Sequence, residues 1–295
     1  MKIALVSCSS MSDYKSDIPN EDELLLSYLH KKGIAAEIVV WDDEHVNWEG
    51  YDIVINKSTW DYFNKPEQFR AWLKEMQARE INLYNSPETI LWNMDKSYLK
   101  DLEKAGIPVI STIWLDKDTL IDLPVVMSQL RARDIIIKPR ISGASKNTYK
   151  VTAQNVLEVQ EKFSELIKNE DYMAQPFMPQ IMEGEYSFIF FNGAFSHAVV
   201  KAPHKDDFRV QHYFGGSITP YLPTDSIKEQ AQKVADAFAS DCLYARVDGL
   251  LIEGVLHIIE LEVIEPMLYL HFNEHSYDNF LKAIKERVQE LAVLN

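Results

Sequence analysis

Short apolar segments alternate with amphipathic ones over the first ninety residues. The apolar segments predict strands at Ile3–Ser7, Ala35–Trp41, Asp52–Asn56 and Ile81–Asn85. Two helices are expected between them: one begins at Asn20 with an acidic first turn and ends at Gly33, and the other spans about Pro66–Ala78. Because strands and helices that alternate in this way build a parallel sheet covered by helices, residues 1–90 are expected to form a parallel α/β domain.

The pattern changes near Pro87, and the next ninety residues mix helices with separate strands. Three helices are expected, ending at Gly106, at about Ala132 and at about Ile167. Strands are expected at Ile107–Ile110, at Asp134–Pro139 and from Tyr172 onwards. This part, at about 110–175, is expected to form a lid-like subdomain.

Two hairpins dominate the rest of the chain. The first joins Ser187–Phe191 to Ala194–Lys201 through Asn192-Gly193, a pair that favours a type I′ turn. The second joins Val247–Ile252 to Val255–Ile264, and an amphipathic helix at about Asp278–Leu291 follows. We therefore expect α+β structure over residues 91–295, in which about 176–295 form a C-terminal antiparallel subdomain.

The composition is that of a globular chain with a hydrophobic core. Apolar residues make up 46% and charged residues 25% of it. The net charge of −15, from 30 basic and 45 acidic residues, excludes a nucleic-acid backbone as partner, because phosphate binding needs a basic face. No apolar run approaches the ~20 residues of a membrane span, and the apolar segment at the N-terminus is shorter than a signal-peptide core. We therefore expect a cytoplasmic protein that binds neither nucleic acid nor membrane.

Two common nucleotide motifs are missing from the sequence. It contains neither G-x-G-x-x-G nor a Walker loop, and the turn after the first strand, Ser7–Ser10, has no glycine. The two cysteines, Cys8 and Cys242, are too few for a disulfide framework and are expected to be reduced and buried.

Three carboxylates near the last hairpin carry the most specific chemical signal. Glu260 and Glu262 lie on one face of a strand because side chains alternate along it, and a three-residue turn would place Asp248 directly across from Glu260. Burying such carboxylates unpaired is costly, and a divalent cation offsets that cost. Three hard oxygen donors suit Mg²⁺. The alternative is a strand face exposed to solvent.

Two further segments suggest a nucleotide. Lys138 ends a buried strand beside the Gly/Ser loop 140–146, and a point charge with backbone N–H groups suits a polyphosphate; alternatively, this lysine is merely exposed. The apolar strand from Tyr172, followed by Glu183–Glu185, could hold a purine by backbone bonds and ribose by a carboxylate; alternatively, it is a core strand.

In this order and spacing, these elements resemble the ATP-grasp superfamily over roughly Leu91–Leu291. Met173–Pro179 with Glu183–Glu185 is similar to the adenine segment of bacterial glutathione synthetase, and Glu260–Pro266 to its metal-binding segment. More similar still is the group that contains the O-ureidoserine cyclo-ligase of cycloserine biosynthesis. Its pattern is matched by Gly184–Ser187, His197–Lys201, Phe208–Gln211, Gly215-Gly216, Tyr244–Asp248 and Glu260–Pro266.

The resemblance implies an ATP-grasp fold, in which a parallel α/β domain precedes two α+β subdomains that enclose the nucleotide. It also implies an ATP- and Mg²⁺-dependent ligase. Such an enzyme phosphorylates a small amino-acid-like carboxylate to an acyl phosphate, which a nitrogen nucleophile then converts to an amide. The new C–N bond joins two substrates or closes a ring within one.

The same resemblance implies roles for individual residues. The residues expected to bind ATP are Lys96, Lys138, Ser142, Gly143, Ala144, Ser145, Gln175, Phe177, Met178 and Glu185. Those expected to bind two Mg²⁺ ions, with Mn²⁺ as an alternative ion, are Asp248, Glu260 and Glu262. Those expected to act in catalysis are Lys201, Arg209 and Arg246.

The chain also departs from glutathione synthetase. Glu262 replaces its usual asparagine, and Ser187 and Lys201 stand where it tends to carry arginines. The resemblance therefore concerns the ATP-binding half rather than the glutathione substrate. The expected partners are small-molecule carboxylate and amine substrates, and assembly as a homodimer stays open.

Two other functions stay open at this stage. One is a regulator that binds ATP without turning it over. The other is a zinc hydrolase, because His271-x-x-Glu274-His275 fits the inverzincin pattern. That pattern needs one helix that presents both histidines on the same face.

Overall fold

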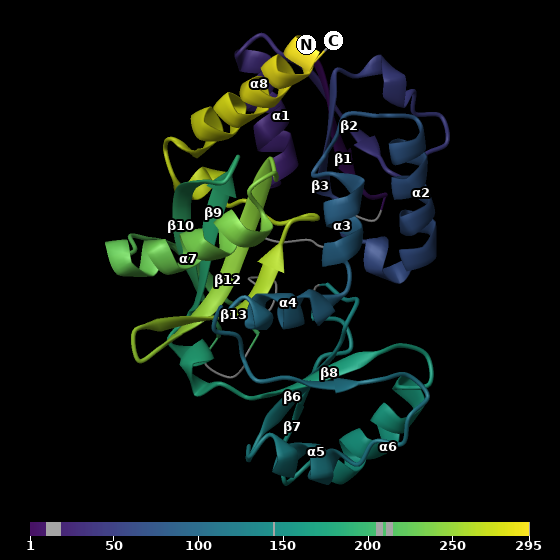
Figure 1. The fold of residues 1–295 in the computed structure, drawn as a ribbon, viewed down its shortest axis with the longest axis vertical. Helices are drawn as coiled ribbons and strands as arrows, with labels where there is room; N and C mark the ends of the chain where they lie inside the picture. The colour runs from purple at the N-terminus through teal and green to yellow at the C-terminus, as the bar shows by residue number, and fades with distance from the viewer. Residues whose placement is uncertain (10–18, 144, 205–208, 211–214, 295) are drawn as a thin grey trace.

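A computed structural model describes residues 1–9, 19–143, 145–204, 209–210 and 215–294 of the protein. Their strands form three sheets, each built from a different part of the chain (Figure 1). The expected mixture of α/β and α+β structure is confirmed. Cys8 and Cys242 are buried and reduced, also as expected.

The first sheet is parallel, as expected. Its strand order is β2 (Ala35–Val40), β1 (Lys2–Ser7), β3 (Ile53–Ser58) and β4 (Leu83–Tyr84). The helices of this region are α1 (Glu21–Lys31), α2 (Pro66–Ala78) and α3 (Pro87–Asn93). Helix α1 shares a core with Ile3 and Leu5, and α2 shares one with Ala4 and Val6, so the two helices cover opposite faces. The Asn20 side chain accepts N–H groups of the first turn of α1, which confirms the predicted N-cap.

The second sheet is antiparallel and lies at the other end of the molecule (Figure 1). Its order is β5 (Ile113–Leu115), β8 (Tyr172–Pro176), β6 (Ile135–Pro139) and β7 (Tyr149–Val151). The helices that precede it or share its core are α4 (Leu99–Lys104), α5 (Leu123–Gln129) and α6 (Val156–Leu166). The strand predicted at Ile107–Ile110 is wrong. Only a single bridge forms there, between Val109 and Ile258, and Pro108 has no N–H with which to extend it.

The third sheet is antiparallel and contains both predicted hairpins. Its order is β11 (Ser217–Tyr221), β10 (Ala194–Ala202), β9 (Glu185–Phe191), β12 (Tyr244–Ile252) and β13 (Val255–Glu262). Asn192 and Gly193 both have positive φ, as a type I′ turn requires, and so do Glu253 and Gly254 at the second turn.

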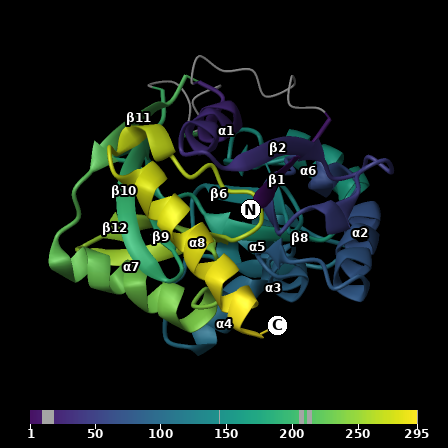
Figure 2. The same ribbon diagram turned by 90° about the horizontal axis from the view of Figure 1, so that it is seen from above.

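A helix covers each face of the third sheet (Figure 2). Helix α7 (Asp225–Phe238), which the sequence analysis does not predict, packs against the face that carries Phe188 and Phe190. Helix α8 (Ser276–Leu294) packs with α1 against the face of Ile189 and Phe191. Among the described helices, none combines the length and the apolar character that crossing a membrane would require.

Candidate active site

A cavity of about 560 Å³ lies where residues of all three sheets meet. Ser58 at the end of β3, Lys138 on β6 and Asp248 on β12 all line it. Every described residue that the sequence analysis assigns to ATP, metal or catalysis also lines this cavity. Ala144 is outside the described residues. Segments as far apart as residues 96 and 262 are thus brought to one place.

Three carboxylates gather on neighbouring strands at the floor of the cavity. In the register of β12 and β13, Asp248 is paired with Glu260, as predicted, and Arg246 with Glu262. One oxygen from each of Asp248, Glu260 and Glu262 lies within 4.8 Å of the others. In the described part of the chain, no other cluster of histidine, cysteine or acidic residues is comparably close. Oxygen donors so arranged fit Mg²⁺.

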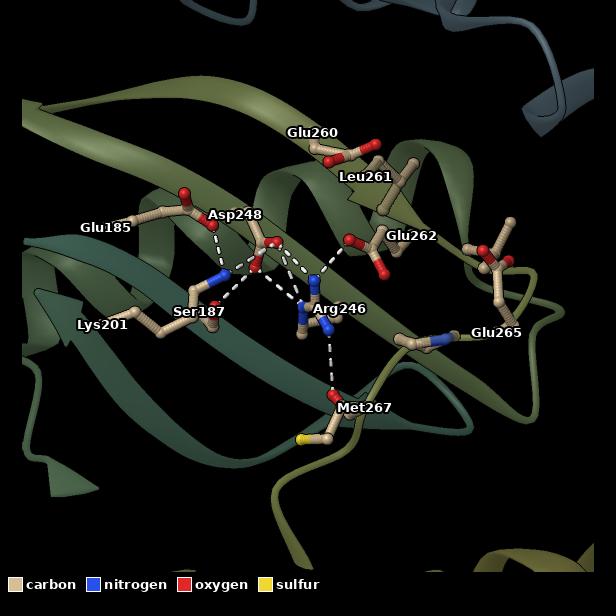
Figure 3. A network of polar contacts seen from close by, with 12 residues as sticks. Glu185, Ser187, Lys201, Arg246, Asp248, Glu260, Leu261, Glu262, Glu265 and Met267 are labelled. Atoms are coloured by element: carbon tan, nitrogen blue, oxygen red, sulfur yellow. Dashed lines mark hydrogen bonds and ion pairs between the residues drawn. The ribbon is translucent and has the colours of Figure 1, made fainter. Parts of the chain in front are cut away.

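Arg246 holds two of these carboxylates, Asp248 and Glu262, together (Figure 3). Its Nη2 donates to Asp248 Oδ2 at 2.8 Å and also to Glu262, while Nη1 donates to the Met267 carbonyl at 3.0 Å. Ser187 Oγ donates to Asp248 Oδ1 at 2.6 Å. The hydrogen bonds of Asp248 therefore occupy most of its acceptor positions, and Glu260 and Glu262 have more capacity left for an ion.

Burial and charge shift the pKa values of these groups in opposite directions. Burial favours the protonated form of Asp248, but Arg246 and Lys201 outweigh it and hold the pKa well below its usual range. Burial, with Glu260 and Asp248 close by, raises the pKa of Glu262 to about 8 despite Arg246. The protein's own cations thus leave Glu262 incompletely neutralised, which a divalent ion at this position would correct.

Three lysines border the carboxylates. Lys201 pairs with Glu185 and lies 3.4 Å from Asp248 Oδ2. Lys96 Nζ donates to the Ser142 carbonyl at 2.6 Å and lies 3.2 Å from Glu260 Oε1. Lys138 makes no hydrogen bond or ion pair with another described residue, and burial lowers the pKa of its ammonium group. An ammonium in this position is suited to an added anion.

The loop after β6 is held from two sides. Ser142 Oγ donates to the Pro139 carbonyl at 3.0 Å. On the other side, Gly143 packs against Phe63 so closely that a Cβ atom on it would lie 2.6 Å from the ring. Lys146 Nζ donates to Asn64 Oδ1 at 2.6 Å. The N-terminal part of the chain therefore contacts this loop directly.

Two backbone groups of the segment expected to hold adenine are already engaged. The Phe177 N–H donates to the Asp134 carbonyl at 2.9 Å, so this amide is not available to a base. Gln175 Nε2 donates to Thr112 Oγ1 at 3.0 Å, and Met178 accepts the N–H of Ile181 through its carbonyl. Glu185, expected at the ribose, is paired with Lys201.

The cavity also contains residues to which the sequence analysis gives no role. Asp22, Trp60, Glu265 and Tyr269 line it. Tyr269 has a φ of 54°, which is rare outside glycine, and its ring lies 5.4 Å from the Arg246 guanidinium carbon. Glu265 lies in the same segment as Glu260 and Glu262, so the sequence alone could have indicated that its carboxylate belongs to the site. The sequence gives no such indication for Asp22, because acidic residues are common in the first turn of a helix.

The zinc pattern lacks the helix that it requires. His271 lies in a 3₁₀ turn at Leu270–Phe272, whereas α8 begins only at Ser276, after His275. His275 pairs with Glu274 at the exposed surface, and neither histidine lines the cavity.

Comparison with known proteins gives two family matches. Residues 3–85 match the N-terminal domain of D-cycloserine synthetase DcsG. Residues 123–273, slightly more than half of the chain, match the ATP-grasp domain of prokaryotic glutathione synthetase. The cycloserine biosynthesis protein DcsG of Streptomyces lavendulae is 25% identical over 291 residues, covering 90% of this chain and 93% of the relative.

Solved structures with the same fold include ligases. D-cycloserine synthetase DcsG superimposes with a TM-score of 0.82 at 23% identity, over 98% of this chain and 100% of that one. D-alanine–D-alanine ligase from Bacillus anthracis in complex with ATP superimposes with a TM-score of 0.69 at 14% identity, over 99% of this chain and 98% of that one. The ATP-grasp ligase PsnB with Mg and ADP superimposes with a TM-score of 0.65 at 15% identity, over 97% of this chain and 98% of that one. With the family match over residues 123–273, these findings establish that the chain belongs to the ATP-grasp ligases, in the family of the prokaryotic glutathione synthetase ATP-grasp domain.

Proposed function

We propose that this protein is an ATP- and Mg²⁺-dependent ligase that activates a small amino-acid-like carboxylate as an acyl phosphate and forms a C–N bond. The observation that carries the proposal is the meeting of three carboxylates and three lysines in one cavity. Carboxylates suit the metal and lysines the phosphates, so the cavity suits the Mg²⁺ complex of a nucleoside triphosphate.

The ATP subsite is proposed on the lysine side. Lys96 and Lys138, with Ser142, Gly143, Ala144 and Ser145, are assigned to the phosphates. Since the Phe177 N–H and the Met178 carbonyl are engaged, we assign adenine recognition to the Met178 N–H and to Gln175, and the ribose to Glu185. Residues 1–90 are proposed as one domain and 91–295 as the ATP-grasp domain.

Glu260 and Glu262, with Asp248 behind them, are proposed to hold Mg²⁺, two ions in all. The bound metal would neutralise phosphate oxygens and lower the barrier to transfer. Mn²⁺ is proposed as a substitute, because it also accepts oxygen ligands.

The proposed reaction has two steps. An oxygen of the substrate carboxylate attacks the γ-phosphorus, the bond to the β-phosphate oxygen breaks, and ADP leaves. A nitrogen then attacks the acyl carbon, the bond to the phosphate oxygen breaks, and the nitrogen loses a proton. Lys201, Arg209 and Arg246 are assigned to orient the carboxylate and to balance the charge that develops in both steps.

The substrate is proposed to carry both reacting groups. The relative that is 25% identical over most of this chain is a cycloserine biosynthesis protein, which favours ring closure within one molecule. Joining two molecules would need the same cavity to admit a separate amine.

The test is ADP release from ATP and Mg²⁺ in the presence of individual amino acids and their derivatives. Release that depends on one added carboxylate supports the ligase, and hydroxylamine should trap its acyl phosphate as a hydroxamate. Binding of ATP without release for any carboxylate would instead indicate a protein that holds ATP without turnover.

A further inference from the structure

The strand that carries Glu260 and Glu262 lies at an edge of its sheet. β13 is the last strand in the order of the third sheet, so β12 bonds only one of its two sides (Figure 1). Leu261 and Val263 flank Glu262 and are fully buried, and buried backbone N–H and C=O groups are costly to leave unpaired. The outer edge of β13 therefore needs partners other than a strand at the place where the two carboxylates lie.

Two side chains provide these partners. Asn93, the last residue of α3, is bonded twice: Nδ2 donates to the Leu261 carbonyl at 2.8 Å, and Oδ1 accepts the Val263 N–H at 3.2 Å. Tyr98 Oη accepts the Leu261 N–H at 2.9 Å. A carboxamide that donates to one residue and accepts from the residue two positions later repeats the bonding of a neighbouring parallel strand. Glu262 lies between the two residues that Asn93 holds.

Burial makes these bonds hard to replace. Asn93 is 6% exposed and Tyr98 is 3% exposed, so water has little access to the groups that they bond. The Tyr98 ring also packs against Trp92, with ring centroids 5.2 Å apart. Loss of either partner would leave backbone groups of Leu261 or Val263 unpaired, and β13 would have to shift to restore them. Such a shift would move the carboxylates that the same strand carries.

The same segment carries Lys96, which is assigned to the phosphates. The 3₁₀ turn Lys96–Tyr98 follows α3 closely, and α3 ends at Asn93. Lys96 Nζ lies 3.2 Å from Glu260 Oε1, and the Lys96 N–H donates to the Arg140 carbonyl at 3.0 Å. One short stretch of chain therefore bonds the outer edge of β13 and also presents a cation to a carboxylate of that strand. This stretch sets the distance between the lysine and the metal ligands.

We propose that Asn93 is a positioning residue for the metal site and that Tyr98 supports it. The two hydrogen bonds of Asn93 hold β13 so that Glu260 and Glu262 face the ion beside Lys96. This inference rests on the proposed function, since it takes these carboxylates to bind Mg²⁺. Asn93 acts through the backbone of β13 and gives no ligand to the ion. Its loss should therefore weaken metal binding, and excess metal should reverse the effect.

Metal binding is tested with Mn²⁺, because the EPR signal of the free ion reports how much is bound. Wild type, Asn93→Leu and Asn155→Leu are titrated in the presence of a non-hydrolysable ATP analogue. Asn155 is a matched control: Nδ2 donates to the Lys150 carbonyl at 2.9 Å and Oδ1 accepts the Thr152 N–H at 2.7 Å, but Asn155 does not line the cavity. We expect Asn93→Leu to raise the Kd for Mn²⁺ roughly tenfold and Asn155→Leu to leave it unchanged. Equal Kd values in wild type and Asn93→Leu, or an equal rise in both variants, overturn the inference.

A second pair of variants changes a single hydrogen bond. Tyr98→Phe keeps the ring and removes only the hydroxyl that accepts the Leu261 N–H, so we expect the Kd for Mn²⁺ to rise roughly two- to tenfold. Tyr172→Phe is its control, because that ring is also buried and its hydroxyl donates to Glu170 at 3.1 Å in the second sheet. Tyr98→Phe decides the inference if circular dichroism shows that Asn93→Leu does not fold. A wild-type Kd in Tyr98→Phe then overturns it.

Kinetics separate this inference from the proposed function. For a carboxylate that triggers ADP release, Asn93→Leu should need roughly ten times more Mg²⁺ for the half-maximal rate, and excess Mg²⁺ should recover most of kcat. Glu260→Gln, which lacks a ligand, should stay inactive at the same concentrations. A loss of kcat in Asn93→Leu that no Mg²⁺ concentration recovers overturns the inference and leaves the ligase intact. Wild type that binds no Mn²⁺ contradicts the proposed metal site, and this inference with it.

Discussion

Arg246 and Asp248 lie two residues apart on the same face of β12, and Arg246 Nη2 is 2.8 Å from Asp248 Oδ2. Both side chains are buried, at 6% and 1% exposed. The same guanidinium also contacts Glu262 on the neighbouring strand. Arg246 therefore fixes the relative positions of two of the three carboxylates assigned to Mg²⁺, and it supplies positive charge at the place where the ion would bind.

Replacing Arg246 should destabilise the protein. Arg246→Met leaves Glu262 without its buried counter-charge and Asp248 with Lys201 alone, so we expect the free energy of unfolding to fall by about 3–5 kcal/mol. Urea unfolding with and without Mg²⁺ measures this, and the loss should shrink with the ion present. Arg133→Met, at an exposed arginine, is the control. A loss equal to that of the control would contradict the role of Arg246.

The metal assignment predicts the effect of two further substitutions. Glu260→Gln and Asp248→Asn should each abolish Mg²⁺-dependent ADP release while the fold is retained, because each removes one anionic oxygen donor. Activity is measured across a Mg²⁺ titration, with circular dichroism to confirm folding and Glu229→Gln as a control for loss of one negative charge. Either variant turning over ATP at the wild-type rate would exclude the three carboxylates as the metal site.

Local sequence patterns were sufficient for much of this site. The alternation of side chains is enough to put Glu260 and Glu262 on one face of β13. The turn has two residues rather than the expected three, and a register shift between Asp248 and Gly249 restores the expected pairing of Asp248 with Glu260. Likewise, Lys138 at the end of an apolar strand leads into the loop at Ser142 and Gly143 that lines the cavity. These features depend on residues close together in the chain.

Features that depend on distant contacts were not predicted. Phe63 reaches Gly143 across eighty residues of sequence, and nothing in either neighbourhood signals that contact. Asp22 forms part of an acidic helix start, a pattern that serves the helix dipole in most proteins and conceals a cavity residue. Helix α7 has a cap at Thr224 and buried apolar residues at helical spacing. Two of these four residues are alanines, which give a weak hydrophobic pattern in the sequence, so the helix was not predicted.

The contact of Phe63 with Gly143 predicts a steric effect on nucleotide binding. Gly143→Ala would place Cβ 2.6 Å from the Phe63 ring, so the loop has to move. Overpacking of this kind costs about 1–3 kcal/mol, and we expect the affinity for ATP to fall roughly tenfold. Adding Phe63→Leu to Gly143→Ala should restore part of the ATP affinity, because the smaller side chain leaves space for the new Cβ atom. Unchanged ATP affinity in Gly143→Ala would show that the loop does not contact the nucleotide.

His197 predicts a dependence of stability on pH. It is 4% exposed, its Nε2 lies 2.9 Å from the Leu268 carbonyl, and burial lowers its pKa. The unfolded chain therefore takes up a proton below about pH 6.5 more readily than the folded protein, and stability present above that pH is lost as pH falls. The advantage of wild type over His197→Gln should shrink between pH 7 and 5, by at most about 1.4 kcal/mol per pH unit. A constant difference over this range would contradict the buried neutral histidine.

Lys138 and Arg209 line the same cavity but are assigned to different steps. Lys138 has no partner among the described residues, so Lys138→Ala should weaken ATP binding roughly 10- to 100-fold, the effect of one charged hydrogen bond, and slow every later step. Arg209→Ala should leave ATP affinity nearly unchanged and slow ADP release, because the activated carboxylate loses a planar donor. Titration of a fluorescent ATP analogue alongside ADP release distinguishes the two variants. An equal loss of ATP affinity in both would mean that Arg209 binds the nucleotide and that the carboxylate end of the cavity lies elsewhere.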